Sequence, residues 1–210
     1  KYFTGSTSSA ELAFKAGHTN DENTFAGLYR FTGGNYDFQF LAGQAGPDYV
    51  AGTGWSGDIK GGGFRGEVSW FIPRKEESES KEAIVASVSG DYTFKNSFYL
   101  QGGFLFNSLG TTGKSEGLSI FDLNLTVKNM SLAKYAVFLQ ASYPITPLFS
   151  ASATSILNTG DGSFYVGPAA TWSLTNNLEL MFTGQLFFGE NNTEYGETGK
   201  AAFARLKWSF

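Results

Sequence analysis

The final stretch of the chain, residues 200–210, alternates between two kinds of side chain. Because successive side chains of a β-strand point to opposite faces, this stretch predicts a strand with one wholly apolar face and one charged face. The apolar face carries Ala202, Ala204, Leu206, Trp208 and Phe210. The other face carries Phe203, Arg205, Lys207 and Ser209. A strand of a water-soluble sandwich can have this pattern, but alternation that persists along a whole chain favours lipid on one side and a wet lumen on the other.

The same period-2 alternation recurs between turn signals throughout the sequence and predicts about twelve strands. They cover residues 10–17, 25–32, 36–43, 49–56, 64–72, 83–94, 98–107, 135–143, 148–157, 163–174, 178–188 and 200–210. We therefore expect an all-β protein: one antiparallel, up-and-down transmembrane β-barrel domain over residues 1–210. No run of about 18 apolar residues is present, so no transmembrane helix is predicted. Residues 1–4 have the pattern of a strand end, which leads us to expect further strands upstream.

The predicted connections alternate between short turns and longer polar loops. The short turns are residues 33–35, 95–97, 144–147 and 175–177, and the long loops are 18–24, 73–82, 108–134 and 189–199. Bacterial membrane barrels place short turns in the periplasm and long loops outside the cell. Residues 118–130 also alternate, which fits either an extra strand or a short amphipathic helix. An even strand count favours a place in an external loop, folded inward as a constriction or packed outside as a cap.

Charged side chains fall on the non-aromatic face of the predicted strands. The residues expected to line the lumen are Lys15, Arg30, Asp37, Arg65, Glu67, Asp91, Glu179, Arg205 and Lys207, with Glu11 beside them. A charge that faced lipid at the bilayer midplane would cost about 2–4 kcal/mol, and this distribution avoids that cost. A soluble, lipocalin-like barrel would place the same charges outside, and alternation alone does not separate the two. The inward charges either pair across strands and fill the interior or give a channel a weak ion preference.

Composition excludes several other classes of function. The chain has no Cys, so a disulfide scaffold, a thiolate metal site and a Cys nucleophile are excluded. Net charge is −4 with no basic patch, which argues against nucleic acid. The 27 Gly, 21 Phe and 10 Tyr suit twisted strands with aromatic girdles at the two membrane interfaces. The one histidine, His18, has no identifiable nucleophile or metal-ligand spacing beside it, so we expect a solvated rim residue, no enzyme, no metal and no cofactor.

Two resemblances to a known family sharpen this prediction. Ala204, Leu206, Trp208 and the terminal Phe210 resemble the last strand of bacterial outer-membrane β-barrels. Residues 25–31, 36–40, 64–71, 91–94, 142–147 and 204–210 resemble the C-terminal half of porin-like outer-membrane proteins of Bacteroidetes and Chlorobi. The likeness implies an outer-membrane location with a periplasmic C-terminus and contact with lipid and lipopolysaccharide. It also implies that the barrel-assembly machinery reads Leu206, Trp208 and Phe210.

The function expected from these patterns is a porin-like channel for passive diffusion of small hydrophilic solutes or ions. The alternative is a non-conducting barrel that serves as a subunit or docking platform of a surface or secretion complex, with a protein partner or as a homo-oligomer. A membrane enzyme ranks third, because it would need a nucleophile clustered with His18.

Overall fold

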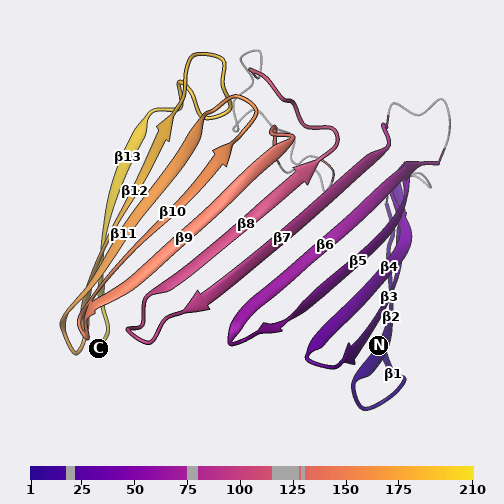
Figure 1. The fold of residues 1–210 in the computed structure, drawn as a ribbon, viewed down its shortest axis with the longest axis horizontal. Coiled ribbons are helices and arrows are strands. Elements are labelled where there is room, and N and C mark those ends of the chain that lie inside the picture. The colour runs from indigo at the N-terminus through magenta and orange to yellow at the C-terminus, as the bar shows by residue number, and fades with distance from the viewer. Residues whose placement is uncertain (18–21, 75–79, 115–127, 129–130) are drawn as a thin grey trace.

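A computed structural model of the chain describes residues 1–17, 22–74, 80–114, 128 and 131–210. Over these residues the fold is one antiparallel sheet of 13 strands, each paired with its neighbours in sequence (Figure 1). The strands are β1 (Tyr2–Phe3), β2 (Ser8–Lys15), β3 (Thr24–Gly33), β4 (Tyr36–Ala45), β5 (Asp48–Ile59), β6 (Gly62–Pro73), β7 (Ala83–Thr93), β8 (Tyr99–Asn107), β9 (Tyr135–Thr146), β10 (Phe149–Asn158), β11 (Phe164–Thr175), β12 (Leu178–Phe188) and β13 (Lys200–Trp208). The prediction of an all-β, antiparallel, up-and-down fold is confirmed. Within the described residues, no helix is long and apolar enough to cross a membrane.

The predicted strands correspond one to one with β2–β13. In the first half of the sheet, the predicted and observed strand ends differ most in β5, which continues at its C-terminal end beyond the predicted range. In the second half, β9 continues to Thr146, so the turn predicted at 144–147 is shorter. A register shift between Phe149 and Ser150 of β10 accommodates this end of the hairpin. Residues 2–3 form β1, which pairs with Ser9 and Ala10 of β2.

Strand register determines which side chains share a face of the sheet. One row runs in direct register across six strands, through Ser9, Arg30, Gln39, Gly54, Glu67 and Ser87. The adjacent row on the same face contains Thr32, Asp37, Ser56, Arg65 and Ser89. A slip of one residue would move each of these side chains to the opposite face. Continuous register therefore keeps the polar residues of β2–β7 together.

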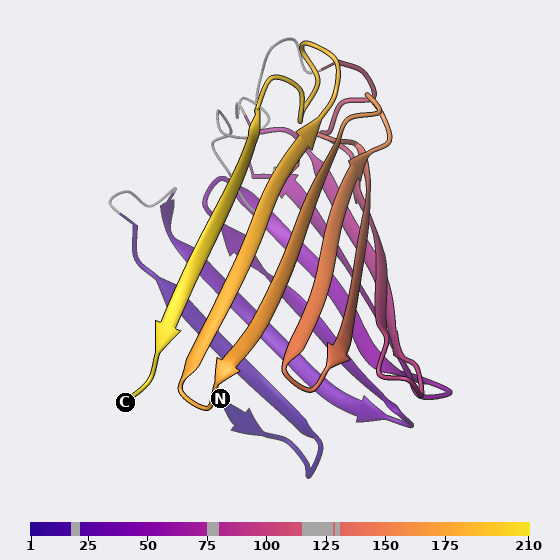
Figure 2. The same ribbon diagram turned by 90° about the vertical axis from the view of Figure 1, so that its left-hand side faces the viewer.

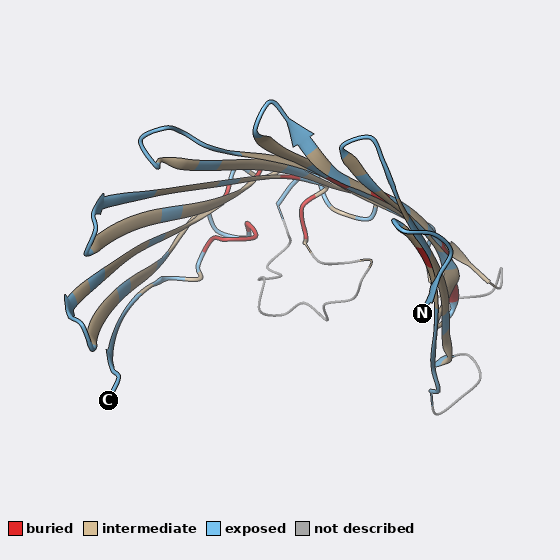
Figure 3. Ribbon diagram, turned by 90° about the horizontal axis from the view of Figure 1, so that it is seen from below, coloured by how far each residue is buried: buried red, intermediate tan, exposed pale blue. Residues whose placement is uncertain are grey.

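The sheet curves into a deep arc whose two ends do not meet (Figure 2 and Figure 3). Among the described residues, β13 pairs only with β12, and the far edge of β2 is covered only by the two residues of β1. The predicted closure into a barrel is therefore not present. The gap lies between β13 and the β1–β2 hairpin, because none of the 13 described strands pairs across these two edges.

The turns after β3, β5, β7, β9 and β11 lie at one end of the sheet, and the longer connections after β6, β8 and β12 lie at the other, together with the short turn between β4 and β5 (Figure 1). Gly34, with a φ of +64°, closes the turn between β3 and β4, in the left-handed region that favours glycine. Both chain ends lie at the short-turn end (Figure 1). His18, most of the connection at 108–134 and, apart from Lys128, the alternating stretch within it lie outside the described residues.

Burial is inverted relative to a water-soluble protein. Large apolar side chains on one face are exposed, among them Leu139 at 52%, Phe182 at 50% and Trp172 at 49%. The small buried cluster of Val50, Phe71 and Ala83 instead lies on the polar-residue face, toward the long connections. The other buried residues include loop positions that lie off the sheet on its concave side (Figure 3).

Candidate functional site

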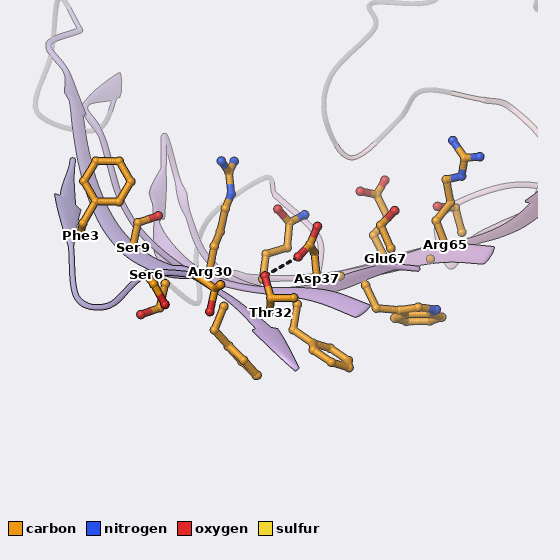
Figure 4. A pocket seen from close by; sticks show the side chains of 18 of the residues that line it. Phe3, Ser6, Ser9, Arg30, Thr32, Asp37, Arg65 and Glu67 are labelled. Carbon is orange, nitrogen blue, oxygen red and sulfur yellow. Dashed lines mark hydrogen bonds between the residues drawn. The ribbon is translucent and has the colours of Figure 1, made fainter. Parts of the chain in front are cut away.

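The candidate site is the concave face of the sheet. Arg30, Asp37, Arg65 and Glu67 project from β3, β4 and β6 toward the side to which the sheet curves (Figure 4). Every second side chain of a strand points to this face, and the cross-strand register places these four residues on the same face. The lumen-facing residues predicted from the sequence thus share one face, and their role as the lining of a pore stays a prediction.

A groove of about 700 Å³ lies on the concave face of the N-terminal half. Arg30, Asp37, Arg65 and Glu67 line it, with the hydroxyls of Ser9, Thr32, Ser56, Ser87 and Ser89 between them. Gly54 lies between Gln39 and Glu67 and leaves room for the Gln39 side chain, because a Cβ at position 54 would come within 2.9 Å of Gln39 Nε2. Polar side chains of mixed charge therefore line the groove, together with several aromatic residues.

Most charges around the groove are compensated by neighbours. Arg65 pairs with Asp91, and Glu11 lies 3.0 Å from Lys1 Nζ and 3.5 Å from Arg30 Nη1. Such exposed ion pairs add little to stability because solvent screens them, so their main effect is to cancel the local field. The Thr32 hydroxyl donates to Asp37 Oδ1 at 2.6 Å.

The structure does not bring all nine predicted residues together. Arg30, Asp37, Arg65, Glu67 and Asp91 form one group around the groove. A second group, Glu179, Arg205 and Lys207, lies on the far limb of the arc, where Glu179 is directly opposite Lys207 and Arg205 opposite Met181. Lys15 stands apart at the end of β2, opposite Thr24.

A cluster of buried polar loop residues was not predicted from the sequence. The connection between β12 and β13 turns inward and buries Glu194, which is 1% exposed. Its carboxylate accepts hydrogen bonds from Asn158 Nδ2 at 2.9 Å, from Ser131 Oγ at 3.5 Å and from the Leu132 backbone N–H. We call Ser131, Leu132, Asn158, Asp161, Ser163 and Glu194 the loop cluster.

Asp161 completes the loop cluster from the β10–β11 connection. Its carboxylate accepts from the Glu194 backbone N–H at 2.8 Å and from the Ser163 N–H and hydroxyl at 2.8 and 2.7 Å. Burial raises the pKa of Glu194, and the nearby Asp161 charge adds to this, while the Asn158, Leu132 and Ser131 donors oppose it. Burial also raises the pKa of the neighbouring Tyr195. Three connections are therefore joined around one buried carboxyl group.

Lys128 is a second anchor between a loop and the sheet. Its Nζ lies 2.6 Å from Asp48 Oδ2 and donates to Ser80 Oγ at 2.6 Å and to the Lys81 carbonyl at 2.8 Å. The same ammonium group lies 5.7 Å from the centre of the Phe71 ring. At this residue, the connection between β8 and β9 contacts the concave face.

No pattern in the sequence pointed to either loop feature. Glu194 follows Asn191, Asn192 and Thr193, a run that is typical of a solvated turn. Its burial depends on residues from two other connections, which only the folded chain brings together. Among the described residues, no group of three or more His, Cys, Asp or Glu side chains is placed to hold a metal ion.

Comparison of the sequence with models of known families gives no match, and comparison with curated proteins gives none. The likeness to porin-like proteins therefore stays a prediction that rests on the residues quoted for it.

Proposed function

We propose that the chain forms wall strands of a transmembrane β-barrel in a bacterial outer membrane, and that the barrel conducts small hydrophilic solutes and ions by passive diffusion. The observation that carries this proposal is the inverted arrangement of the two faces. The convex face exposes large apolar side chains, and the concave face carries the charged ones. A sheet that exposed its apolar face to water would present a patch far larger than the few hundred Å² found on soluble proteins.

The details of the convex face support lipid as its partner. Tyr135 and Tyr143 stand near the two ends of β9 and are both exposed, with Leu139 between them. Aromatic residues at both interfaces with an aliphatic centre are typical of a barrel strand in a bilayer. The 11 residues of β12, at about 3.3 Å each and a tilt of about 45°, rise about 25 Å, the height of the apolar band.

Closure of the barrel is part of the proposal. Main-chain N–H and C=O groups on the free edges of β13 and β2 need partners in lipid, where water cannot supply them. The Lys200–Trp208 and Ser8–Lys15 strands run in opposite directions, so they are able to pair directly as antiparallel neighbours or through intervening strands. A second copy of the chain or further strands of the same polypeptide would supply such intervening strands.

The free edge of β13 also carries the residues expected to guide assembly. Leu206 and Trp208 are exposed on the apolar face, and Phe210 extends beyond the strand with full exposure. An unpaired edge with accessible apolar side chains suits docking to another strand. We propose that the barrel-assembly machinery recognises this edge.

Transport would combine steric sieving with the field of the concave charges. Because Arg65 pairs with Asp91 and Arg30 lies beside Glu11, cations and anions nearly cancel along the N-terminal half. Weak ion selectivity follows from such a mixture.

A second candidate function is a non-conducting barrel that docks a partner. The loop cluster favours it, because Glu194 and Asp161 tie the β12–β13 and β10–β11 connections into one ordered surface. That surface lies on the concave side, where it would also narrow a lumen (Figure 3).

Conductance of the purified protein in a planar bilayer, with a salt gradient, separates the two functions. The channel proposal expects discrete current steps and a small reversal potential. Arg65→Ala should shift that potential toward cation preference by leaving Asp91 without its partner. The matched change Lys95→Ala, in the exposed turn between β7 and β8, should leave it unchanged. Absence of current from folded, inserted protein would refute the channel and favour docking.

A further inference from the structure

We propose that the part of the concave face formed by β8–β11 binds uncharged, polyhydroxylated rings, that is, small saccharides, as they pass. This inference rests on the proposed channel and adds a solute class to it. It starts from a difference between this part, called the uncharged half below, and the charged strands on both sides of it.

The uncharged half comprises β8, β9, β10 and β11. None of these four strands contains a Lys, Arg, Asp or Glu on either face. The strands on their N-terminal side, β2–β7, carry the groove charges, and charge returns on the other side at Glu179 of β12. An ion gains little from the uncharged half, so this half is suited to solutes that need hydrogen bonds rather than charge.

Six uncharged polar side chains form a compact patch in the middle of this half. Gln101, Gln140 and Thr154 are in direct register on β8, β9 and β10. Tyr99, Ser142 and Ser152 form the adjacent row of the same face. We call these six residues the neutral patch. Directly opposite side chains lie about 5 Å apart and the next ones along a strand about 7 Å, which matches the spacing of hydroxyl groups on one or two sugar rings.

The neutral patch has hydrogen-bonding capacity that the protein does not use. Tyr99 Oη donates to Gln101 Oε1 at 3.0 Å. No side-chain hydrogen bond forms from Gln140, Ser142, Ser152 or Thr154 within the part of the chain that the structure describes. Each glutamine amide offers two donor hydrogens and an acceptor oxygen, and each hydroxyl offers one donor hydrogen and an acceptor oxygen. These half-buried groups therefore need water or a solute as a partner.

An apolar row borders the neutral patch. Phe138, Ile156 and Tyr165 are in direct register one row away, on the same face. The Tyr165 ring leans over Gly167, where a Cβ would come within 2.3 Å of the tyrosine hydroxyl oxygen. Gly167 is directly opposite Thr154, so this ring lies at the edge of the patch. Aromatic surface beside a few convergent polar groups is typical of small-molecule sites, and a sugar ring has C–H groups on its faces and hydroxyls around its rim.

Binding of maltotriose to the purified protein in detergent micelles, followed by saturation-transfer NMR, tests the inference without relying on conductance. We expect a saturable signal that does not appear with a sugar acid of one ring. The double variant Gln101→Ala/Gln140→Ala should bind about tenfold more weakly, the loss expected for about two hydrogen bonds. Gln185→Ala, the same change at an exposed site of the concave face outside the patch, should bind like the unmodified protein.

Two further results separate this inference from the channel itself. Gln140→Glu keeps the size of the side chain, so a folded variant with unchanged maltotriose affinity would overturn the neutral patch. No saturable signal from the unmodified protein, or equal affinity in the double variant and in Gln185→Ala, would also overturn it. Current steps in the bilayer alongside either result would leave the channel standing. Maltotriose binding without current would overturn the channel, and with it the claim that the patch serves transport.

Discussion

Replacement of Glu194 by alanine should open the loop cluster locally. The carboxylate accepts from Asn158 Nδ2, Ser131 Oγ and the Leu132 N–H, and the residue is 1% exposed. Alanine removes the acceptor and leaves these donors without a partner. The Asp161 contacts to the Glu194 backbone do not depend on the side chain, so the sheet itself should stay intact.

The size of the effect follows from the Asn158 amide and the Leu132 backbone donor. A buried donor without a partner costs about 1–3 kcal/mol, so the Asn158 amide and the Leu132 N–H together give about 2–6 kcal/mol. Water that enters the opened loop recovers part of this, which favours the lower end. About 2 kcal/mol corresponds to about a 30-fold increase in the population of the open loop.

Amide hydrogen exchange measures this opening directly. Exchange of the backbone amides of 193–196 should accelerate about 30-fold in Glu194→Ala, whereas amides in β11 and β12 keep their protection. Glu197→Ala, an exposed position of the same connection, is the matched control. Exchange of 193–196 within about threefold of the unmodified protein would refute the role assigned to the buried carboxylate.

Three other perturbations have defined outcomes. Because burial raises the pKa of Glu194, the Glu194 carboxyl holds its proton more tightly in the folded loop cluster than in the open loop. The stability of the cluster should therefore be greatest below the ordinary pKa and fall as pH rises from the ordinary to the raised pKa. Amide exchange of 193–196 against pH will detect this fall, and Glu194→Gln should remove it. Phe182→Arg, on the convex face midway along β12, should destabilise the folded protein in lipid by about 2–4 kcal/mol, whereas Thr183→Arg on the concave face should cost much less. Urea unfolding in vesicles compares the two variants, and equal losses of unfolding free energy would contradict the assignment of faces. Lys128→Met keeps a long, flexible side chain but leaves the Asp48 carboxylate buried without its cation, at a cost of about 3–5 kcal/mol. The added change Asp48→Asn should restore most of the unfolding free energy, and no loss in the single variant would rule out the anchor.

The sheet was predictable because its determinants are local. Alternation such as Tyr135, Val137, Leu139, Ala141 and Tyr143 on one face of β9 needs only neighbours in sequence. The same period assigned Arg30, Asp37, Arg65 and Glu67 to one face, and cross-strand register then brought them around one groove. Closure was not predictable in this way, because it depends on how the edges of β2 and β13 are paired rather than on any strand alone.

The loop contacts lay beyond sequence reasoning for a different reason. Glu194, Asn158 and Ser131 are far apart in the chain and have ordinary turn-like surroundings in sequence. Their burial results from three connections that meet above the concave face, and no periodic pattern encodes such a meeting. Lys128 likewise belongs to a predicted loop, and its partner Asp48 begins β5, which is not adjacent to β8 or β9 in the sheet.

The central claim is that the convex face contacts lipid and the concave face contacts water. The chain contains no cysteine, so a single spin label can be moved along β9 from Val137 to Ser142 in reconstituted protein, and its collisions with oxygen and with a water-soluble nickel complex measured. We predict that labels at Val137, Leu139 and Ala141 collide mainly with oxygen and labels at Phe138, Gln140 and Ser142 mainly with nickel. The same preference at all positions, or the reverse alternation, would contradict the membrane assignment and favour a soluble sheet whose apolar face is covered by protein.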